Sequence, residues 1–183
     1  MRNPRAPRAT GLSVTPLALA TLPVFAAAAL AAVAPRPVLL WNGTPSEPQG
    51  LYIRSIATPA PGRIIAFRTP ARAFPYADGR MGYLRRIPIL KAVAAGEGDQ
   101  VCARAGVLTI NGARRGAILA RDGEGSRLPV WRGCRALTRG EFFVFSDRIP
   151  NSFDSRYYGP VTQALILGVF QPLMVSDTGA RGV

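Results

Sequence analysis

Two residues of this 183-residue chain, Ser46 and Lys91, combine reactive side chains with unusual surroundings. Lys91 lies in an apolar run and is the single lysine among 23 basic residues, and the chain contains no histidine. Burial can drive a lysine amine neutral, so that it accepts a proton, whereas arginine stays charged. Lys91 is therefore a candidate general base. The plain alternative is a leftover lysine in a composition that favours arginine.

Ser46 lies between Pro45 and Pro48, in a stretch that also holds two glycines and that we expect to form a stiff loop. A serine nucleophile needs a base, and the absence of histidine excludes the usual Ser-His-Asp triad. A Ser-Lys pair is the variant that this composition allows. Taken alone, Ser46 would be an ordinary loop serine, so the hypothesis depends on Lys91.

Short strands are expected to position these residues. In a strand over residues 87–95, Lys91 would share one face with Ile89 and Val93, which buries its stem. The pair Asn111-Gly112 predicts a hairpin, and residues 69–83 read as loop. Four further segments have the short apolar pattern of strands: 51–57, 63–68, 100–102 and 141–146.

The N-terminal region has the pattern of a membrane anchor. Residues 1–10 carry three arginines and no acid, and the uncharged apolar run 11–34 is long enough to span a bilayer core of about 30 Å. Arginines before the run predict a cytoplasmic N-terminus and an exported remainder. A cleavable signal peptide is the alternative, but Pro35 after the small-x-small sequence favours a retained anchor. Residues 161–175 are too short for a second span; we interpret them as a core strand, with membrane-surface contact as the alternative.

Three motifs follow one another along the chain. In the first, Ser46-Glu47-Pro48 precedes Gly50-Leu51-Tyr52; in the second, residues 90–99 contain Lys91 and end in Gly-Asp. The third, residues 151–161, reads N-S-x-D-S-R-x-x-G-x-V. Together they resemble the motifs of the Ser-Lys signal peptidases (peptidase family S26), and most closely those of the TraF-like peptidases of conjugative transfer systems. The resemblance extends from about residue 42 to residue 172.

This resemblance implies a role for several residues. Ser46 would be the nucleophile and Lys91 the general base, and the Thr44 hydroxyl would form the oxyanion hole with the backbone N–H of Ser46. Supporting residues would be an ion pair of Asp154 with Arg156, and Ser152, which would hydrogen-bond and orient the lysine amine.

The chain departs from the family pattern at two places. Ala92 follows the lysine where arginine is common, and Ser146 replaces the glycine that usually begins the third motif. The second departure leaves the role of Asp147 open. Neither change removes a member of the expected dyad.

The implied fold is mainly β. It consists of a signal-peptidase-like antiparallel β-sheet or barrel catalytic domain with a small inserted β subdomain, preceded by one N-terminal transmembrane helix. The expected divisions are a cytoplasmic basic tail at 1–10, the anchor at 11–34, a first catalytic part at 35–102, the inserted subdomain at 103–140, a second catalytic part at 141–176 and a flexible tail at 177–183.

Cys102 and Cys134 are the two cysteines of the chain. In an exported domain an even count favours a disulfide, which would stabilise the fold by roughly 3 to 4 kcal/mol; two free buried thiols are the alternative. Two thiols without histidine make a metal site improbable. The net charge of +13 favours an anionic partner. Because the arginines lack interleaved aromatic residues, membrane lipid headgroups fit better than nucleic acid.

We therefore expect a single-pass inner-membrane serine endopeptidase that needs no cofactor and whose catalytic domain is periplasmic. The resemblance implies cleavage of exported precursors after small residues, the conjugative pilin being the expected substrate and other conjugation or type IV secretion components possible partners. The sequence leaves open whether the product is linear or cyclised. The alternative is a catalytically degenerate, membrane-anchored scaffold of such an apparatus. The anchor and the cysteines disfavour a repressor-type autoprotease.

Overall fold

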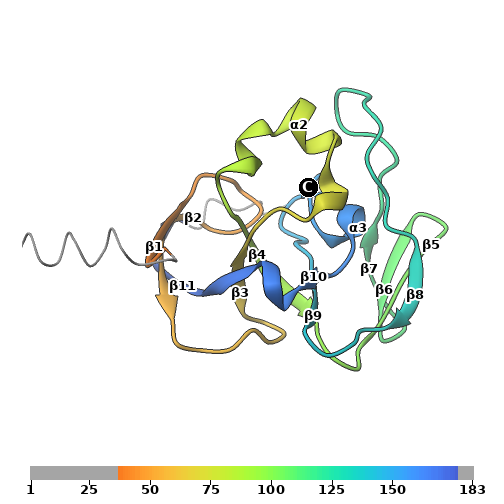
Figure 1. Cartoon of the computed structure of the whole chain (residues 1–183). Coiled ribbons are helices and arrows are strands. Elements are labelled where there is room, and N and C mark those ends of the chain that lie inside the picture. The colour runs from red at the N-terminus through yellow and green to blue at the C-terminus, as the bar shows by residue number, and fades with distance from the viewer. Residues whose placement is uncertain (1–36, 177–183) are drawn as a thin grey trace, which may run out of the picture. The chain divides into compact units, whose positions relative to one another are not determined.

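The computed structural model describes residues 37–176, which form two antiparallel β-sheets, with short helices between strands of the larger one (Figure 1). The expectation of a mainly β, antiparallel fold is thus confirmed. The predicted basic tail, anchor and C-terminal tail, residues 1–10, 11–34 and 177–183, lie outside the described residues. Between residues 37 and 176, no helix combines the length and the apolar character needed to cross a membrane.

The larger sheet has seven strands in the order β1-β2-β11-β3-β4-β9-β10. Their bounds are Leu39–Asn42 (β1), Gln49–Ser55 (β2), Ile64–Phe67 (β3), Ile89–Ala95 (β4), Glu141–Val144 (β9), Val161–Thr162 (β10) and Ile166–Ser176 (β11). The last strand, β11, lies between β2 and β3, and it therefore connects the strand after the Ser46 loop to the strand that pairs with β4. The sequence analysis did not predict β1, whose four residues are too few for a clear pattern.

The smaller sheet has the strand order β7-β6-β5-β8. Its strands are Gln100–Arg104 (β5), Val107–Ile110 (β6), Ala113–Ala117 (β7) and Gly133–Ala136 (β8). The expected hairpin joins β6 to β7, with positive φ angles of 51° at Asn111 and 80° at Gly112. The expected disulfide joins Cys102 to Cys134 at directly paired positions of β5 and β8. The limits 103–140 for an inserted subdomain stay a prediction.

Three apolar clusters fill the interior of the described residues, and two of them show how the sheets are connected. One contains Ile65, Val93 and Val169 from the larger sheet. The other lies against the smaller sheet and includes Val101 of β5 and Phe143 of β9. Because β4 and β9 supply residues to both clusters, the two sheets share a core around the strand that carries Lys91.

Helical turns replace the loop that the sequence predicted over residues 69–83. They are η1 (Ala71–Ala73), α2 (Tyr76–Arg80) and η2 (Gly82–Arg85); further along lie α3 (Ser155–Tyr158) and η3 (Gln163–Leu165). The first three are single turns between prolines and glycines, so their local pattern resembles that of a loop. We call residues 71–87 the cap segment.

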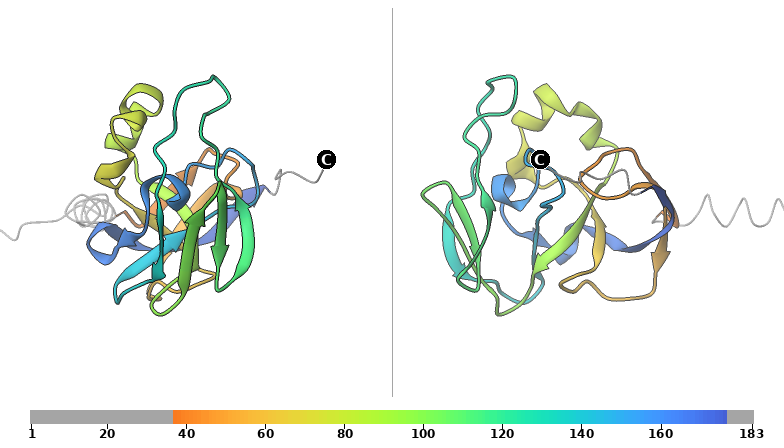
Figure 2. Two further views of the ribbon diagram at one scale, coloured as in Figure 1. Left: turned by 90° about the vertical axis from the view of Figure 1, so that its right-hand side faces the viewer. Right: turned by 180° about the vertical axis from the view of Figure 1, so that it is seen from behind.

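The connection from β7 to β8, residues 118–132, is named the arm, and it rises beside α2 (Figures 1 and 2). The Tyr76 hydroxyl donates a hydrogen bond to Asp122 at 2.9 Å. Arg80 donates hydrogen bonds to Glu124 and Ser126. These polar contacts fasten the cap segment to the arm.

Candidate active site

The loop that carries Ser46 is built around Asn42, the last residue of β1. Its side-chain amide donates hydrogen bonds to the carbonyl oxygens of Thr44, Glu47 and Pro48, each at 3.0 Å. Its Oδ1 accepts a hydrogen bond from the backbone N–H of Thr44 at 3.1 Å. One buried side chain thus fixes the whole loop. The sequence analysis missed Asn42, although an asparagine directly before a Gly-x-Pro turn was an available signal.

The Gly-Leu-Tyr triplet after the loop has a structural reason. Gly50 has φ of +140°, and a Cβ there would lie 2.2 Å from the carbonyl oxygen of Met174 in β11. Only glycine allows this close approach of the two strands. The Tyr52 hydroxyl donates a hydrogen bond back to the Pro48 carbonyl at 2.7 Å, which closes the loop from its far end.

Ser46 and Lys91 are in direct contact. The Lys91 amine donates a hydrogen bond to Ser46 Oγ, and each residue is only 4% exposed. Burial lowers the pKa of Lys91 to about 8, while Asp154 and Glu47 act to raise it and Arg156 to lower it. A lysine with such a pKa is partly neutral near physiological pH, and its lone pair can then take the proton of the serine hydroxyl.

Thr44 lies beside the nucleophile. Its Oγ1 is 3.3 Å from Ser46 Oγ and donates a hydrogen bond to Asn42 Oδ1 at 2.9 Å. Thr44 is an exposed residue of this loop. This position fits the predicted role of Thr44 in an oxyanion hole, which stays a prediction.

The third motif supplies a buried ion pair. Arg156 Nε and Nη2 donate hydrogen bonds to the two carboxylate oxygens of Asp154 at 2.8 and 2.9 Å. Asp154 is fully buried and also caps α3, accepting the backbone N–H of Arg156 at 3.2 Å. Arg156 Nη1 donates to the carbonyl of Ala117 at 2.8 Å, so the pair ties the smaller sheet to the site. The predicted pairing of Asp154 with Arg156 is present.

The expected hydrogen bond between Ser152 and the Lys91 amine is absent. Ser152 is 1% exposed and its Oγ has no hydrogen-bond partner. The amine is directed at Ser46 instead, which corrects the expected contact. Ser152 does line the same cavity as Lys91, and a role in orienting the amine stays a prediction.

Two further residues of the site were not assigned a function from the sequence. Ser146, noted there only as a departure from the family pattern, donates a hydrogen bond from its hydroxyl to the Ser46 carbonyl. Its own backbone N–H donates to Asp154 at 3.3 Å. Glu47 is buried directly beside the nucleophile and contacts the strand of Lys91. Asp147, next to Ser146, is exposed.

A cavity of about 440 Å³ opens onto Ser46 and Lys91. Its walls are mainly apolar and come from β1 on one side and from the cap segment on the other. Tyr83 and Ile87 of the cap segment line the cavity and are 50% and 54% exposed, so much of their apolar surface is accessible from solvent. A wider hollow of about 960 Å³ near Ile56 contains none of the candidate catalytic residues.

The arrangement can perform acyl transfer. It holds a buried serine hydroxyl and an adjacent lysine amine of lowered pKa, the two groups that a Ser-Lys acyl transfer requires. Residues 37–176 contain no cluster of three or more histidine, cysteine or acidic side chains arranged to hold a metal ion.

Comparison with known proteins agrees with this chemistry. Residues 11–174 match the family described as "Signal peptidase, peptidase S26". The chain is 32% identical to a probable conjugal transfer protein TraF of Sinorhizobium fredii over 145 residues, which are 73% of this chain and 75% of that protein. It is 30% identical to the plasmid transfer protein TraF of Escherichia coli over 148 residues, 73% of this chain and 81% of the relative.

Among solved structures, a signal peptidase I from Enterococcus faecalis matches 64% of this chain and 100% of its own, with 26% sequence identity and a TM-score of 0.39. The family match extends over most of the chain, and the two TraF relatives cover nearly three quarters of it. The chain is therefore a TraF-like member of the signal peptidase family S26.

Proposed function

We propose that the chain is a serine endopeptidase that cleaves exported precursor proteins, with Ser46 as nucleophile and Lys91 as general base. The observation that carries this proposal is the buried hydrogen bond between the Lys91 amine and Ser46 Oγ. In a chain without histidine, this contact supplies the one base that the serine needs.

In the proposed mechanism, neutral Lys91 takes the hydroxyl proton while Ser46 Oγ attacks the substrate carbonyl carbon. The Thr44 hydroxyl and the Ser46 backbone N–H stabilise the oxyanion. The protonated amine then gives its proton to the leaving nitrogen as the peptide bond breaks and an acyl ester forms on Ser46. Water, deprotonated by the regenerated amine, attacks this ester and releases the acid product.

The proposed substrate is an exported precursor with small residues before the scissile bond, and we propose the conjugative pilin because the relatives are named as conjugal or plasmid transfer proteins. The apolar cavity beside Ser46 is suited to an extended peptide without large charged groups. The proposed location is the periplasmic face of the inner membrane, with residues 11–34 as anchor and conjugation components as neighbours. A membrane-anchored scaffold without catalysis is the competing function.

The test follows both the substrate and the covalent intermediate. The full chain is incubated with a conjugative pilin precursor, and the reaction is quenched in acid and analysed by intact mass. We expect an acyl adduct on the wild type. Ser46→Ala should lose the adduct and slow cleavage by at least about a thousandfold. Ser55→Ala, on β2 outside the site, is the matched control.

Cleavage by Ser46→Ala at the wild-type rate would contradict the peptidase proposal and favour the scaffold. The mass of the product also distinguishes two fates of the acyl-enzyme. A product lighter by one water than the linear form would mean that the substrate's own amine, rather than water, attacks the ester.

A further inference from the structure

Glu47 is a buried acid directly after the candidate nucleophile. It is 5% exposed, and burial acts to raise the pKa of its carboxyl group. An ionised carboxylate is costly to bury unless hydrogen bonds and opposite charges compensate it. Neither the proposed mechanism nor the family resemblance gives this residue a task.

The contact of Glu47 joins two motifs that are 45 residues apart. Its Oε1 accepts a hydrogen bond from the backbone N–H of Ala92 at 2.8 Å, and Ala92 follows Lys91 in β4. The carbonyl of Ala92 accepts a hydrogen bond from Phe145, just past the end of β9, at 3.2 Å. The N–H and carbonyl groups of one strand residue point to the same side. The carboxylate of Glu47 therefore takes the place of a strand carbonyl where β9 ends.

The charges around the amine come from several elements. Lys91 faces Asp154 and Glu47, which favour its charged form, and Arg156, which disfavours it. Glu47 in turn faces Lys91 and Arg148, which favour its ionised form, and Asp147, which opposes it. Both carboxylate oxygens of Asp154 accept hydrogen bonds from Arg156 in a bidentate ion pair. Glu47 is thus a second buried acid whose charge acts on the amine.

We propose that Glu47 is a positioning residue of this site: its hydrogen bond to Ala92 holds the Ser46 loop against the lysine strand, and its negative charge faces the Lys91 amine. The proposal rests on the proposed function of Ser46 and Lys91. The hydrogen bond keeps the two reacting groups in contact. The charge stabilises the protonated amine, so its removal favours the neutral form at lower pH.

The charge effect is tested on the full chain in detergent micelles, without any substrate. Because Lys91 is the single lysine, isotope-labelled lysine gives one side-chain NMR signal that needs no assignment. In Glu47→Gln, which keeps an acceptor oxygen but removes the charge, we expect the Lys91 titration midpoint to fall by about one pH unit. Glu97→Gln, the same change at an exposed acid after β4, is the matched control and should leave the midpoint in place. A midpoint equal to that of the wild type in Glu47→Gln overturns the charge effect.

The positioning effect is tested by kinetics on the same variants. In Glu47→Gln the acid limb of the pH–rate profile should move to lower pH by the same shift, and the plateau kcat should stay within about threefold of the wild type. Glu47→Ala, which also loses the hydrogen bond, should lower the plateau kcat by at least about tenfold with little change in KM. Wild-type plateau kcat in Glu47→Ala overturns the positioning effect.

Thermal unfolding of each variant shows whether it is folded, and if Glu47→Ala is not, the nearly isosteric Glu47→Gln still carries the test of the charge effect. Failure of the proposed function has a different signature. The wild type would then cleave no precursor, while the lysine titration would still report whether Glu47 faces the amine.

Discussion

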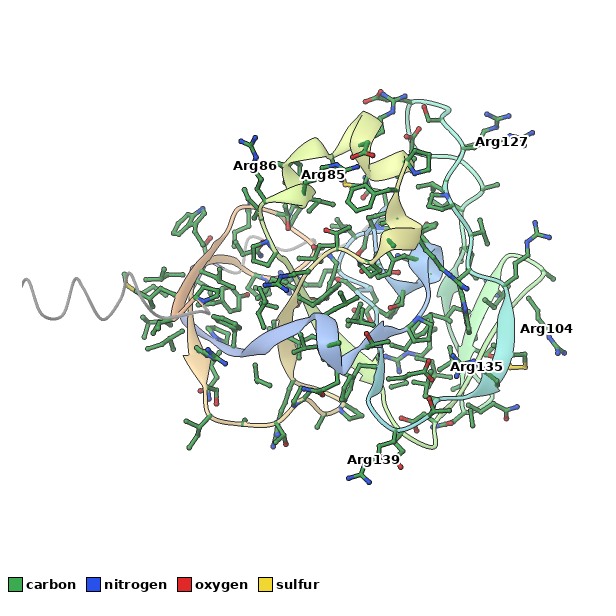
Figure 3. All side chains as sticks on the ribbon, in the orientation of Figure 1. Arg85, Arg86, Arg104, Arg127, Arg135 and Arg139 are labelled. Atoms are coloured by element: carbon green, nitrogen blue, oxygen red, sulfur yellow. A yellow bond between two sulfur atoms is a disulfide. The ribbon has the colours of Figure 1, made fainter. Side chains whose placement is uncertain are left out.

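The candidate site and the smaller sheet differ in the type and the burial of their cationic side chains. In the site, the Lys91 amine is buried against a serine hydroxyl, where the protein lowers its pKa. On and around the smaller sheet the cations are exposed arginines; Arg135 pairs with Glu141, whereas the labelled side chains of Arg104, Arg127 and Arg139 project from the surface (Figure 3). An exposed guanidinium remains hydrated and charged at every working pH.

Under the proposed mechanism, this contrast explains the position of the single lysine. A proton acceptor must exist in a neutral form near neutral pH, and a buried amine can do so whereas a guanidinium cannot. Arg156 is buried as well, but it is matched by Asp154 on two hydrogen bonds and keeps its charge. Burial can therefore produce a neutral side chain at Lys91, because an amine can lose its proton, but not at Arg156.

The largest expected effect comes from Lys91→Arg, which keeps the positive charge and removes the proton acceptor. We expect kcat/KM to fall by at least about a thousandfold, because Ser46 then has no base. In the wild type, kcat/KM should rise as the pH increases through about 8, since only the neutral amine is active. Both are measured by precursor cleavage across pH. If Lys91→Arg retained more than a tenth of wild-type activity, the site would not need a residue that can lose its proton, and the contrast with the arginines of the smaller sheet would have no functional meaning.

The second effect concerns stability. Arg156→Gln leaves Asp154 buried without its cation and should lower the free energy of unfolding by about 3 to 5 kcal/mol. Urea denaturation measures this change. The double variant with Asp154→Asn should recover part of the loss, because the uncompensated charge is gone. A loss below about 1 kcal/mol in the single variant would mean that this pair behaves like a surface ion pair.

The smallest effect is expected on the smaller sheet. Arg104 lies at the end of β5 and is exposed, so Arg104→Gln should change the free energy of unfolding by no more than about 0.5 kcal/mol. Its pH–rate profile should overlay that of the wild type. A displaced profile would show that the exposed arginines act on the Lys91 amine over a distance, which would weaken the contrast.

The sequence predicted the features that are local or belong to a recognisable motif. These include the strand of Lys91, the hairpin at Asn111-Gly112 and the residue types of the third motif. The contacts that complete the site could not be predicted from the sequence, because they join residues that are far apart in the chain. Ser146 reaches Ser46 across 100 positions and Ala92 reaches Glu47 across 45. The absent bond of Ser152 has the same origin, since the direction of the amine is set by the placement of the Ser46 loop.

The hydrogen bonds between the cap segment and the arm affect how chimeras between relatives could be made. They join Tyr76 to Asp122, and Arg80 to Glu124 and Ser126. The cap segment forms one wall of the cavity, and the arm holds that segment from outside. A chimera that receives a foreign cap segment alone would lose its fastening. To replace this wall of the cavity, residues 71–87 and 118–132 would therefore have to be exchanged together.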